Sequence, residues 1–356
     1  MTSTTRSVLP PGLPRDLAVY LGAVLLTLLV GLGLVLLSGA DPRTALDALT
    51  DGMFGSAYGF GSALNAAAVL ALIGAGFTIA RRAGLVNVGG EGQLALGGIA
   101  AAAVGTTLPA TTPPALAVTL VLVAGFLAGG AWAGLAAALV VWRRTSEVIT
   151  TLLLNFVGLG LVTLVVHEEG LLRQPVTSAE TLPQSAPLVA PARLPLLGTP
   201  GSPATIAVLL AVVAAVVTAI VLRRTVTGTR LAAVGLSEPA AARLGLPVAR
   251  LRFGALSVAG GLAGLAGAGL VATVPFVLAE HFTSGYGFAG LVVGLLARGS
   301  LTAVVGIALA FGLLASGGIN LQLAAGVPAS SVQIVQSVLT ILVAAAVVLR
   351  GTGGAR

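Results

Sequence analysis

The residues best suited to chemistry in this sequence lie between positions 84 and 93, which read GLVNVGGEGQ. Asn87, Glu91 and Gln93 lie there among glycines, between two long apolar runs. A carboxylate at membrane depth is costly unless it faces protein or water. Each glycine weakens helix formation by about 1 kcal/mol, so the stretch predicts a broken or re-entrant segment.

Two interpretations of this stretch stay open from the residues alone. In the first, Asn87, Glu91 and Gln93 line a polar cavity on a solute path, together with freed backbone groups. In the second, they form a structural network. Glu91 then accepts hydrogen bonds from backbone N–H groups, or it pairs with Arg81 or Arg82.

A second polar cluster lies in the stretch RRTSEVITTLLLNFV, residues 143–157. Ser146 can cap a helix there, and Glu147 occupies its first turn, where the helix dipole favours an acid. Glu147, Thr151 and Asn155 are spaced four apart and share one helical face. Such a stripe can line a transport path or tie helices together.

Composition decides what kind of elements must position these side chains. The chain has 356 residues, of which 57% are hydrophobic and only 8% charged, with a mean hydropathy of +1.07. An ordinary soluble domain carries about 25% charged residues. The 49 glycines and long Ala/Leu/Val runs favour closely packed helices over a β-barrel. We expect one all-α polytopic domain, a bundle of helices embedded in the lipid bilayer.

The residue types that the sequence lacks exclude several kinds of catalytic and binding site. All 18 basic residues are arginine, so a P-loop and a Schiff-base lysine are excluded, and the lack of cysteine excludes thiol catalysis. His167 and His281 are far apart in sequence, and we therefore predict no metal site. No HExxH motif or nucleophile elbow is present, which disfavours an enzyme. The formal charge of +7 comes from arginines between apolar segments, so no nucleic-acid partner is expected.

A transmembrane helix needs about 20 apolar residues, and by that rule we predict ten spans. They are 17–38, 61–80, 86–105, 115–142, 147–167, 203–222, 253–275, 285–297, 301–318 and 331–349, of which the eighth is the weakest.

The arginines predict the orientation of these spans. With a cytoplasmic N-terminus, 15 arginines fall inside, Arg6 and Arg356 among them. Three fall outside, namely Arg43, Arg173 and Arg193. The positive-inside rule therefore predicts that both termini are cytoplasmic.

Two connections are too long for simple turns. The outer one, 168–202, is rich in proline, which favours extended backbone lying on the extracytoplasmic surface, either as a partner site or as a spacer. The inner one, 223–252, contains a short helix: Ser237 suits the N-cap, Glu238 the first turn and Gly245 a left-handed end. The excess of arginine in this cytoplasmic loop fits anionic lipid or a docked cytoplasmic protein.

Pairs of glycines four residues apart predict close helix contacts. They are Gly125 with Gly129, Gly130 with Gly134, Gly260 with Gly264, and Gly290 with Gly294.

Four stretches resemble the permease subunits of ABC importers in the branched-chain amino acid and simple-sugar permease superfamily, particularly its nucleoside-type branch. GLVNVGGEGQLALGG is similar to the family's G-L-x-N-I-G-x-E-G-Q signature, and SEVITTLLLNFV to its N-E-V-I-x-T-x-x-L-N segment. RLAAVGLSEPAAARLGL resembles the cytoplasmic coupling segment, and GYGFAGLVVGLLARGS the late glycine-rich motif. They occur in family order from about residue 60 to the C-terminus.

The resemblance implies a permease in the bacterial cytoplasmic (inner) membrane that binds no cofactor itself. A second permease subunit, a cytoplasmic ATPase that uses the ATP, and an extracytoplasmic solute-binding protein are its expected partners. Segment 231–246 would fit a groove on the ATPase. Its candidate contacts are Arg230, Ser237, Glu238 and Arg243. The candidates for the solute path or its supporting network are Asn87, Glu91, Gln93, Glu147 and Asn155.

The resemblance implies nucleosides or a simple sugar as the solute. Nucleoside-type members often carry aspartate where this chain has Ala289, and the usual Asn-Pro that follows is missing. A proton- or ion-coupled secondary transporter is the competing class. It needs a titrating group inside the membrane, for which Glu91 is the one acid well inside the predicted spans.

Overall fold

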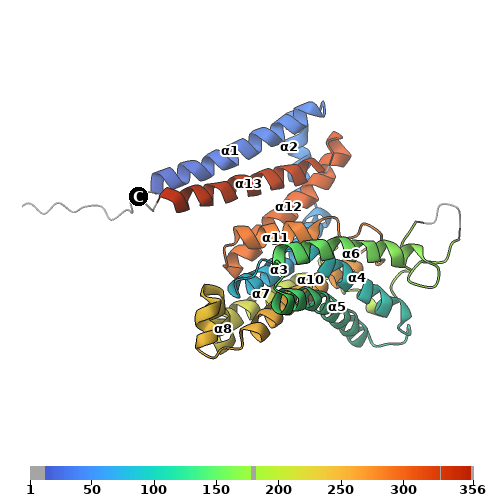
Figure 1. Ribbon diagram of the computed structural model, residues 1–356. Helices are drawn as coiled ribbons and strands as arrows, with labels where there is room; N and C mark the ends of the chain where they lie inside the picture. Colours follow the sequence, from blue (N-terminus) through green and yellow to red (C-terminus); the bar gives the residue numbers. More distant parts are fainter. Residues whose placement is uncertain (1–12, 178–181, 329, 354–356) are drawn as a thin grey trace, which may run out of the picture. The chain divides into compact units, whose positions relative to one another are not determined.

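The computed structural model describes residues 13–177, 182–328 and 330–353 (Figure 1). Over these ranges the chain forms thirteen α-helices, one π-helix and one 3₁₀-helix, and its only extended pairings are isolated bridges. The all-α prediction is confirmed. Contacts divide the chain into two compact units. One unit contains Met53–Ser316, and the other contains the chain up to Gly52 and from Gly317 onward.

Every predicted span overlaps a helix, with ends that differ by several residues in some cases. These helices are α1 (Leu13–Leu37), α3 (Ala57–Arg82), α4 (Gly90–Thr107), α5 (Pro114–Arg143), α6 (Glu147–His167), α7 (Ala207–Arg224), α10 (Val248–Val271), α11 (Tyr286–Leu296), α12 (Leu301–Ala325) and α13 (Ser330–Gly353).

Fewer helices than predicted are long and apolar enough to cross a membrane. Within the described part of the chain there are six: α3, α5, α6, α7, α10 and α12. A seventh is reached if Leu25–Leu37 and Pro42–Gly55, bent by 114°, form one broken span. The protein is therefore a multi-pass helical membrane protein with six or seven candidate spans. The count of ten and the orientation remain predictions, and Arg6 and Arg356 lie outside the described residues.

The weakest predicted span, 285–297, is a half-length helix. α11 has 11 residues, which gives about 16 Å at 1.5 Å per residue. A bilayer hydrocarbon core is about 30 Å thick, so α11 is too short to cross it alone.

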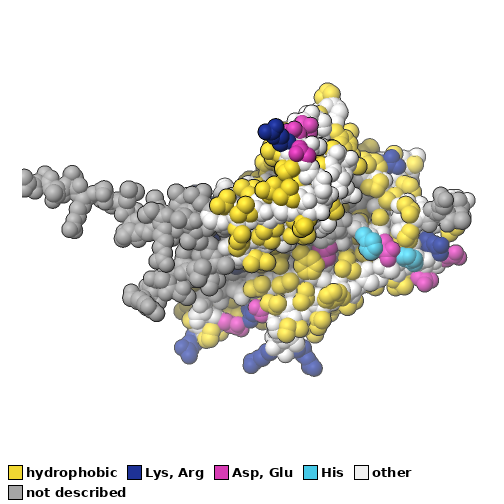
Figure 2. Space-filling model, turned by 90° about the horizontal axis from the view of Figure 1, so that it is seen from above, with side chains coloured by type: hydrophobic (Ala, Val, Ile, Leu, Met, Phe, Trp, Pro, Cys, Tyr) yellow, Lys and Arg dark blue, Asp and Glu magenta, His cyan; other side chains and the backbone are white. Residues whose placement is uncertain are grey.

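Two central helices carry the packing of the larger unit. α3 and α10 bury 83% and 72% of their most apolar stretches, and α10 packs against α5, α4 and α3 (Figure 1). α6, by contrast, buries 22%. Most exposed side chains of α6 and α7 are apolar, which suits contact with lipid. Figure 2 shows hydrophobic side chains spread over the coloured part of the surface, where charged groups form small separate patches.

The glycine pairs lie at helix contacts, as the sequence predicts. Gly129 of α5 faces Gly264 of α10 so closely that an added Cβ would lie 2.6 Å from the Gly264 Cα atom. Gly290 and Gly294 of α11 lie in the same way against Ile73 and Phe77 of α3. Larger side chains at these positions would force the helices apart.

Part of the outer connection is packed rather than loosely extended. Its described residues include the 3₁₀-helix Ala190–Ala192 and the fully buried Ser185 and Leu188. The Ser185 N–H donates to the Leu278 carbonyl at 2.9 Å, and its Oγ accepts from the Leu278 N–H at 2.9 Å. This connection therefore covers the segment that follows α10. Residues 178–181 of it lie outside the described part.

The inner connection contains two helices, α8 (Val226–Leu236) and α9 (Glu238–Arg243). Ser237 caps α9 by accepting a hydrogen bond from the Ala240 N–H at 3.4 Å, and Gly245 has a φ of +78°. The predicted short helix and both of its boundary residues are therefore confirmed. α8 was not foreseen.

The smaller unit is built around α1 and α13, which lie side by side (Figure 1). α2 (Pro42–Thr50) follows α1 and begins where Asp41 accepts a hydrogen bond from the Thr44 N–H at 3.0 Å. The π-helix Asp51–Gly55 continues from α2. The Asn320 amide of α12 donates to the Ala48 carbonyl at 2.7 Å, which ties α12 to α2.

Candidate functional site

The polar residues singled out from the sequence meet at the start of α4. Residues 85–88, between α3 and α4, are not helical, so the predicted break is confirmed. α4 has Gly89 as its N-cap, and a glycine has no side chain to accept from the first N–H groups of the helix. Other side chains must therefore satisfy these donors.

Glu91 is the charged centre of this region and is 2% exposed. Its Oε1 accepts a hydrogen bond from the Gly285 N–H at 3.1 Å, and its Oε2 accepts one from the Gly287 N–H at 2.7 Å. Gly285 is the N-cap of α11, so one carboxylate lies at the N-terminal ends of both α4 and α11. Helix dipoles stabilise an anion at such a position.

Glu91 thus accepts hydrogen bonds from backbone N–H groups, which is one of the two structural roles considered for it; the other was an ion pair with Arg81 or Arg82. Arg81 and Arg82 are exposed at the end of α3, and among the described residues neither forms an ion pair with Glu91.

Asn87 and Gln93 form a reciprocal pair of amides. The Asn87 Nδ2 donates to the Gln93 Oε1 at 2.9 Å, and the Gln93 Nε2 donates to the Asn87 Oδ1 at 3.0 Å. The Asn87 Oδ1 also accepts from the Gly89 N–H at 3.0 Å. Both side chains are buried. The pair fixes the turn that leads into α4.

Asn155 joins α6 to the same turn. Its Oδ1 accepts from the Gly92 N–H at 2.8 Å, and its Nδ2 donates to the Val88 carbonyl at 2.9 Å. One turn earlier, the Thr151 hydroxyl accepts from the Val88 N–H at 3.2 Å. The polar stripe predicted on 147–167 therefore supplies the cap that Gly89 lacks.

Glu147 lies apart from this cluster. It is partly exposed in the first turn of α6, and its contribution to the stripe is its backbone carbonyl, which accepts from the Thr151 hydroxyl at 2.7 Å. The structure therefore brings together Asn87, Glu91, Gln93 and Asn155, but not the Glu147 carboxylate.

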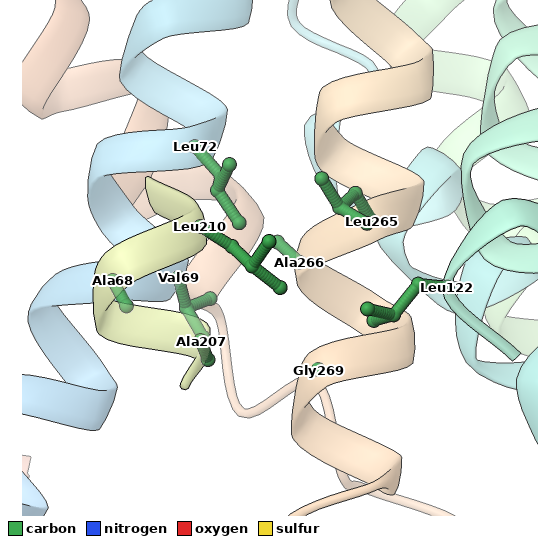
Figure 3. A pocket seen from close by; sticks show the side chains of 9 residues that line it. All are labelled: Ala68, Val69, Leu72, Leu122, Ala207, Leu210, Leu265, Ala266 and Gly269. Atoms are coloured by element: carbon green, nitrogen blue, oxygen red, sulfur yellow. The ribbon is translucent and has the colours of Figure 1, made fainter. Parts of the chain in front are cut away.

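A small hollow lies between α3, α5, α7 and α10 (Figure 3). Apolar groups line it throughout, from Val69 and Leu72 on α3 to Leu210 on α7 and Leu265 on α10. Binding sites for polar solutes contain a few convergent polar groups, which this hollow lacks.

The candidate residues in the inner connection divide into two kinds. Ser237 and Glu238 are engaged within the chain: Ser237 caps α9, and the Glu238 Oε2 accepts from the Arg252 Nη1 at 2.7 Å. Arg230 and Arg243 are exposed. Arg252 belongs to α10, and this contact between α9 and α10 is not predictable from the sequence.

Leu236 and Leu244, on either side of α9, were also missed. They are 88% and 78% exposed, the largest exposed fractions among the large apolar side chains of the inner connection. Their position within an arginine-rich loop was the sequence feature that could have indicated exposed apolar contacts.

Two further polar contacts were not foreseen. Asn65 of α3 donates to the Pro203 carbonyl at 2.7 Å and accepts from the Thr205 N–H at 3.0 Å, which fixes the entry to α7. His167 lies 3.9 Å from Glu280, the residue before His281. The described residues contain no group of three or more potential metal-binding side chains.

Comparison with known proteins assigns the chain to a family. Residues 59–344 match the family described as branched-chain amino acid transport system / permease component. This chain belongs to that permease family. The matched range agrees with the extent of the four motifs in the sequence.

Individual relatives extend over nearly the whole permease. A guanosine ABC transporter permease of Bacillus subtilis is 30% identical over 338 residues, covering 94% of each chain. A glucose ABC transporter permease of Haloferax volcanii is 32% identical over 87% of this chain and 82% of its own. A nucleoside ABC transporter permease of Lactococcus lactis is 28% identical over 97% of this chain and 92% of its own. No solved structure matches significantly.

Family membership decides the class of the protein. It is a membrane permease subunit of an ABC importer and not an enzyme, and the ATPase of such a system is a separate chain. The nucleoside-type branch recognised in the motifs is supported by the two relatives named for nucleosides.

Proposed function

We propose that this permease imports nucleosides, with a simple sugar as the second candidate, into a bacterial cell across the cytoplasmic membrane. The observation that carries the proposal is similarity over 94% of the chain to a guanosine permease. The sugar candidate rests on the glucose permease, which is 32% identical. Ala289, where nucleoside-type members often carry aspartate, is the residue that keeps the sugar in consideration.

The proposed topology has ten membrane-inserted helices with both termini in the cytoplasm. Its support is that each predicted span overlaps a helix and that the arginine distribution favours this orientation. α11 enters only half of the bilayer in this scheme.

The solute path is proposed to lie between this permease and a second permease subunit. Within the larger unit, the buried amides and carboxylate at the start of α4 already have protein partners, and the hollow of Figure 3 is apolar. A polar solute therefore needs groups that a second subunit contributes. Haloferax volcanii contains two relatives named for glucose transport, which supports pairing of two such chains.

Asn87, Glu91, Gln93 and Asn155 are accordingly assigned to the supporting network rather than to solute contact. They cap α4 and α11 at the point where two central segments are interrupted. Glu147, at the partly exposed start of α6, remains a candidate for the path or for contact with the ATPase.

Segment 231–246 is proposed to dock on the cytoplasmic ATPase. Leu236 and Leu244 provide exposed apolar contacts, and Arg230 and Arg243 provide charges around them. Apolar anchors with a charged rim are typical of protein interfaces. Ser237 and Glu238 hold α9 in place instead of contacting the ATPase directly.

The test of the solute assignment is uptake by proteoliposomes that contain the permease, its copurified ATPase and its binding protein. We expect ATP-dependent accumulation of labelled guanosine or uridine that excess glucose does not reduce. Accumulation of glucose without nucleoside uptake would move the assignment to the sugar. Transport of neither would contradict both.

A further inference from the structure

One buried carboxylate, that of Glu91, accepts two backbone hydrogen bonds from the start of α11. We propose that α11 moves as a rigid body during transport and that Glu91 is the positioning residue that holds it against α4. The effect of Glu91 on uptake rests on the proposed transport function, whereas the effect of Glu91 on the position of α11 does not.

Both ends of α11 are turns of unusual backbone conformation. Ser284 and Gly285 precede the helix with φ angles of +43° and +78°, and Arg298 and Gly299 follow it with +51° and +88°. Left-handed residues at both ends interrupt helical hydrogen bonding, so α11 is not a rigid extension of its neighbours. Changes in a few dihedral angles at such positions are sufficient to swing a helix.

Glycines make up most of the fully buried face of α11. Gly287, Gly290 and Gly294 lie on it, and Val293 is the one larger side chain among the buried residues of the helix. Gly287 packs directly on the Glu91 backbone, and Gly290 and Gly294 pack on Ile73 and Phe77. The glycines fit closely, whereas Val293 and the partly buried Tyr286, Val292 and Leu296 supply the apolar contacts of α11 with the surrounding core.

The Glu91 carboxylate supplies the directional contact that this surface lacks. Its two oxygens accept the N–H groups of Gly285 and Gly287, the N-cap and second residue of α11, and Gly285 has no side chain to accept them instead. Hydrogen bonds to an ionised acceptor are about twice as strong as neutral ones. Withdrawing the carboxylate leaves the buried Gly287 N–H and the part-buried Gly285 N–H without their partner.

The lack of cysteine in the chain makes the motion directly measurable. Spin labels would be placed at Val258→Cys on α10 and Leu295→Cys on α11, which are 43% and 42% exposed. Distances between the two labels would be measured by pulsed electron paramagnetic resonance in nanodiscs. Three labelled proteins would be compared: one with no further change, one with Glu91→Gln and one with Glu91→Ala. Thr78→Val is the matched control, because Thr78 is 3% exposed but donates only within α3, to the Gly74 carbonyl at 2.9 Å.

We expect one narrow distance distribution in the native and Thr78→Val proteins. In both Glu91 variants a second distance should appear, with its population raised about tenfold or more, as expected for loss of a pair of charge-assisted bonds. Uptake should fall in those variants while ATP hydrolysis by the bound ATPase continues, which a general loss of folding would not produce.

An unchanged distribution in Glu91→Gln, which keeps the shape of the side chain and so is expected to fold, would overturn the proposal even if Glu91→Ala failed to fold. Failure of native permease to transport nucleosides or sugars would instead refute the proposed function and leave the distance measurement valid.

Discussion

Asn155 accepts the backbone N–H of Gly92 at 2.8 Å, across 63 residues of sequence, and thereby caps a helix whose own N-cap is a glycine. The same device recurs at α11, where Glu91 replaces a missing cap side chain from a distant part of the chain. Interrupted helices in this permease therefore depend on caps supplied by other segments.

Replacing Asn155 by leucine should destabilise the permease by about 1–3 kcal/mol, because the Gly92 N–H and the Val88 carbonyl lose their buried partner. The midpoint of thermal unfolding in detergent measures this loss. Thr119→Val is the control, since its exposed hydroxyl donates only to the Ala115 carbonyl of the same helix. Equal midpoints for both variants would contradict the capping role.

Gly264→Ala should cost about 1–3 kcal/mol by overpacking, because a Cβ there would press on the Gly125 carbonyl and the Gly129 backbone of α5. Gly160→Ala is the matched control on α6, where an added Cβ meets no atom within 4 Å. It should be neutral or slightly stabilising, because alanine favours helix. The midpoint of thermal unfolding of each variant measures the effect. Equal midpoints for Gly264→Ala and Gly160→Ala would contradict close packing at Gly264.

Charge reversal at the Glu238 and Arg252 pair should displace α9 from α10. Glu238→Arg or Arg252→Glu alone should lower ATP-coupled uptake several-fold, whereas the double exchange restores the pair and much of the uptake. The partly exposed pair itself contributes at most about 1 kcal/mol, so loss of coupling rather than unfolding is the expected result. Normal uptake in both single variants would show that the pair does not position α9.

Leu236→Ser combined with Leu244→Ser should weaken binding of the ATPase about tenfold or more, because exposed apolar anchors carry much of the energy of an interface. Binding can be measured by titrating the ATPase against the permease in nanodiscs. Leu171→Ser, on the outer connection and 54% exposed, is the control. Undiminished affinity in the double variant would remove the two leucines from the interface.

Apolar run length and glycine content were sufficient to predict every long helix and the break before α4. They could not predict which helices cross the membrane, since 285–297 is as apolar as a span but only half as long. The position of Ser237 and Gly245 predicted α9 because capping is a local property of a few consecutive residues.

The sequence predicted most of the residues that form the site, but not the hydrogen bonds between them. Asn87, Gln93 and Asn155 stand out as amides among apolar residues, but the sequence does not show that Asn87 and Gln93 pair with each other or that Asn155 bonds to the backbone of residues 88 and 92. Acceptance of backbone hydrogen bonds by Glu91 was one of the alternatives left open by the sequence, and the identity of its donors, Gly285 and Gly287, depends on the tertiary fold. Leu236 and Leu244 escaped notice because exposure of a leucine is not visible in a sequence with so many apolar residues.

The most direct test of the account is solute accumulation in vesicles that contain this permease with and without its ATPase. Only the complete complex supplied with ATP should concentrate nucleoside or sugar, and a proton gradient should not replace ATP. Accumulation driven by a proton or ion gradient in vesicles that lack the ATPase would contradict the account and identify a secondary transporter.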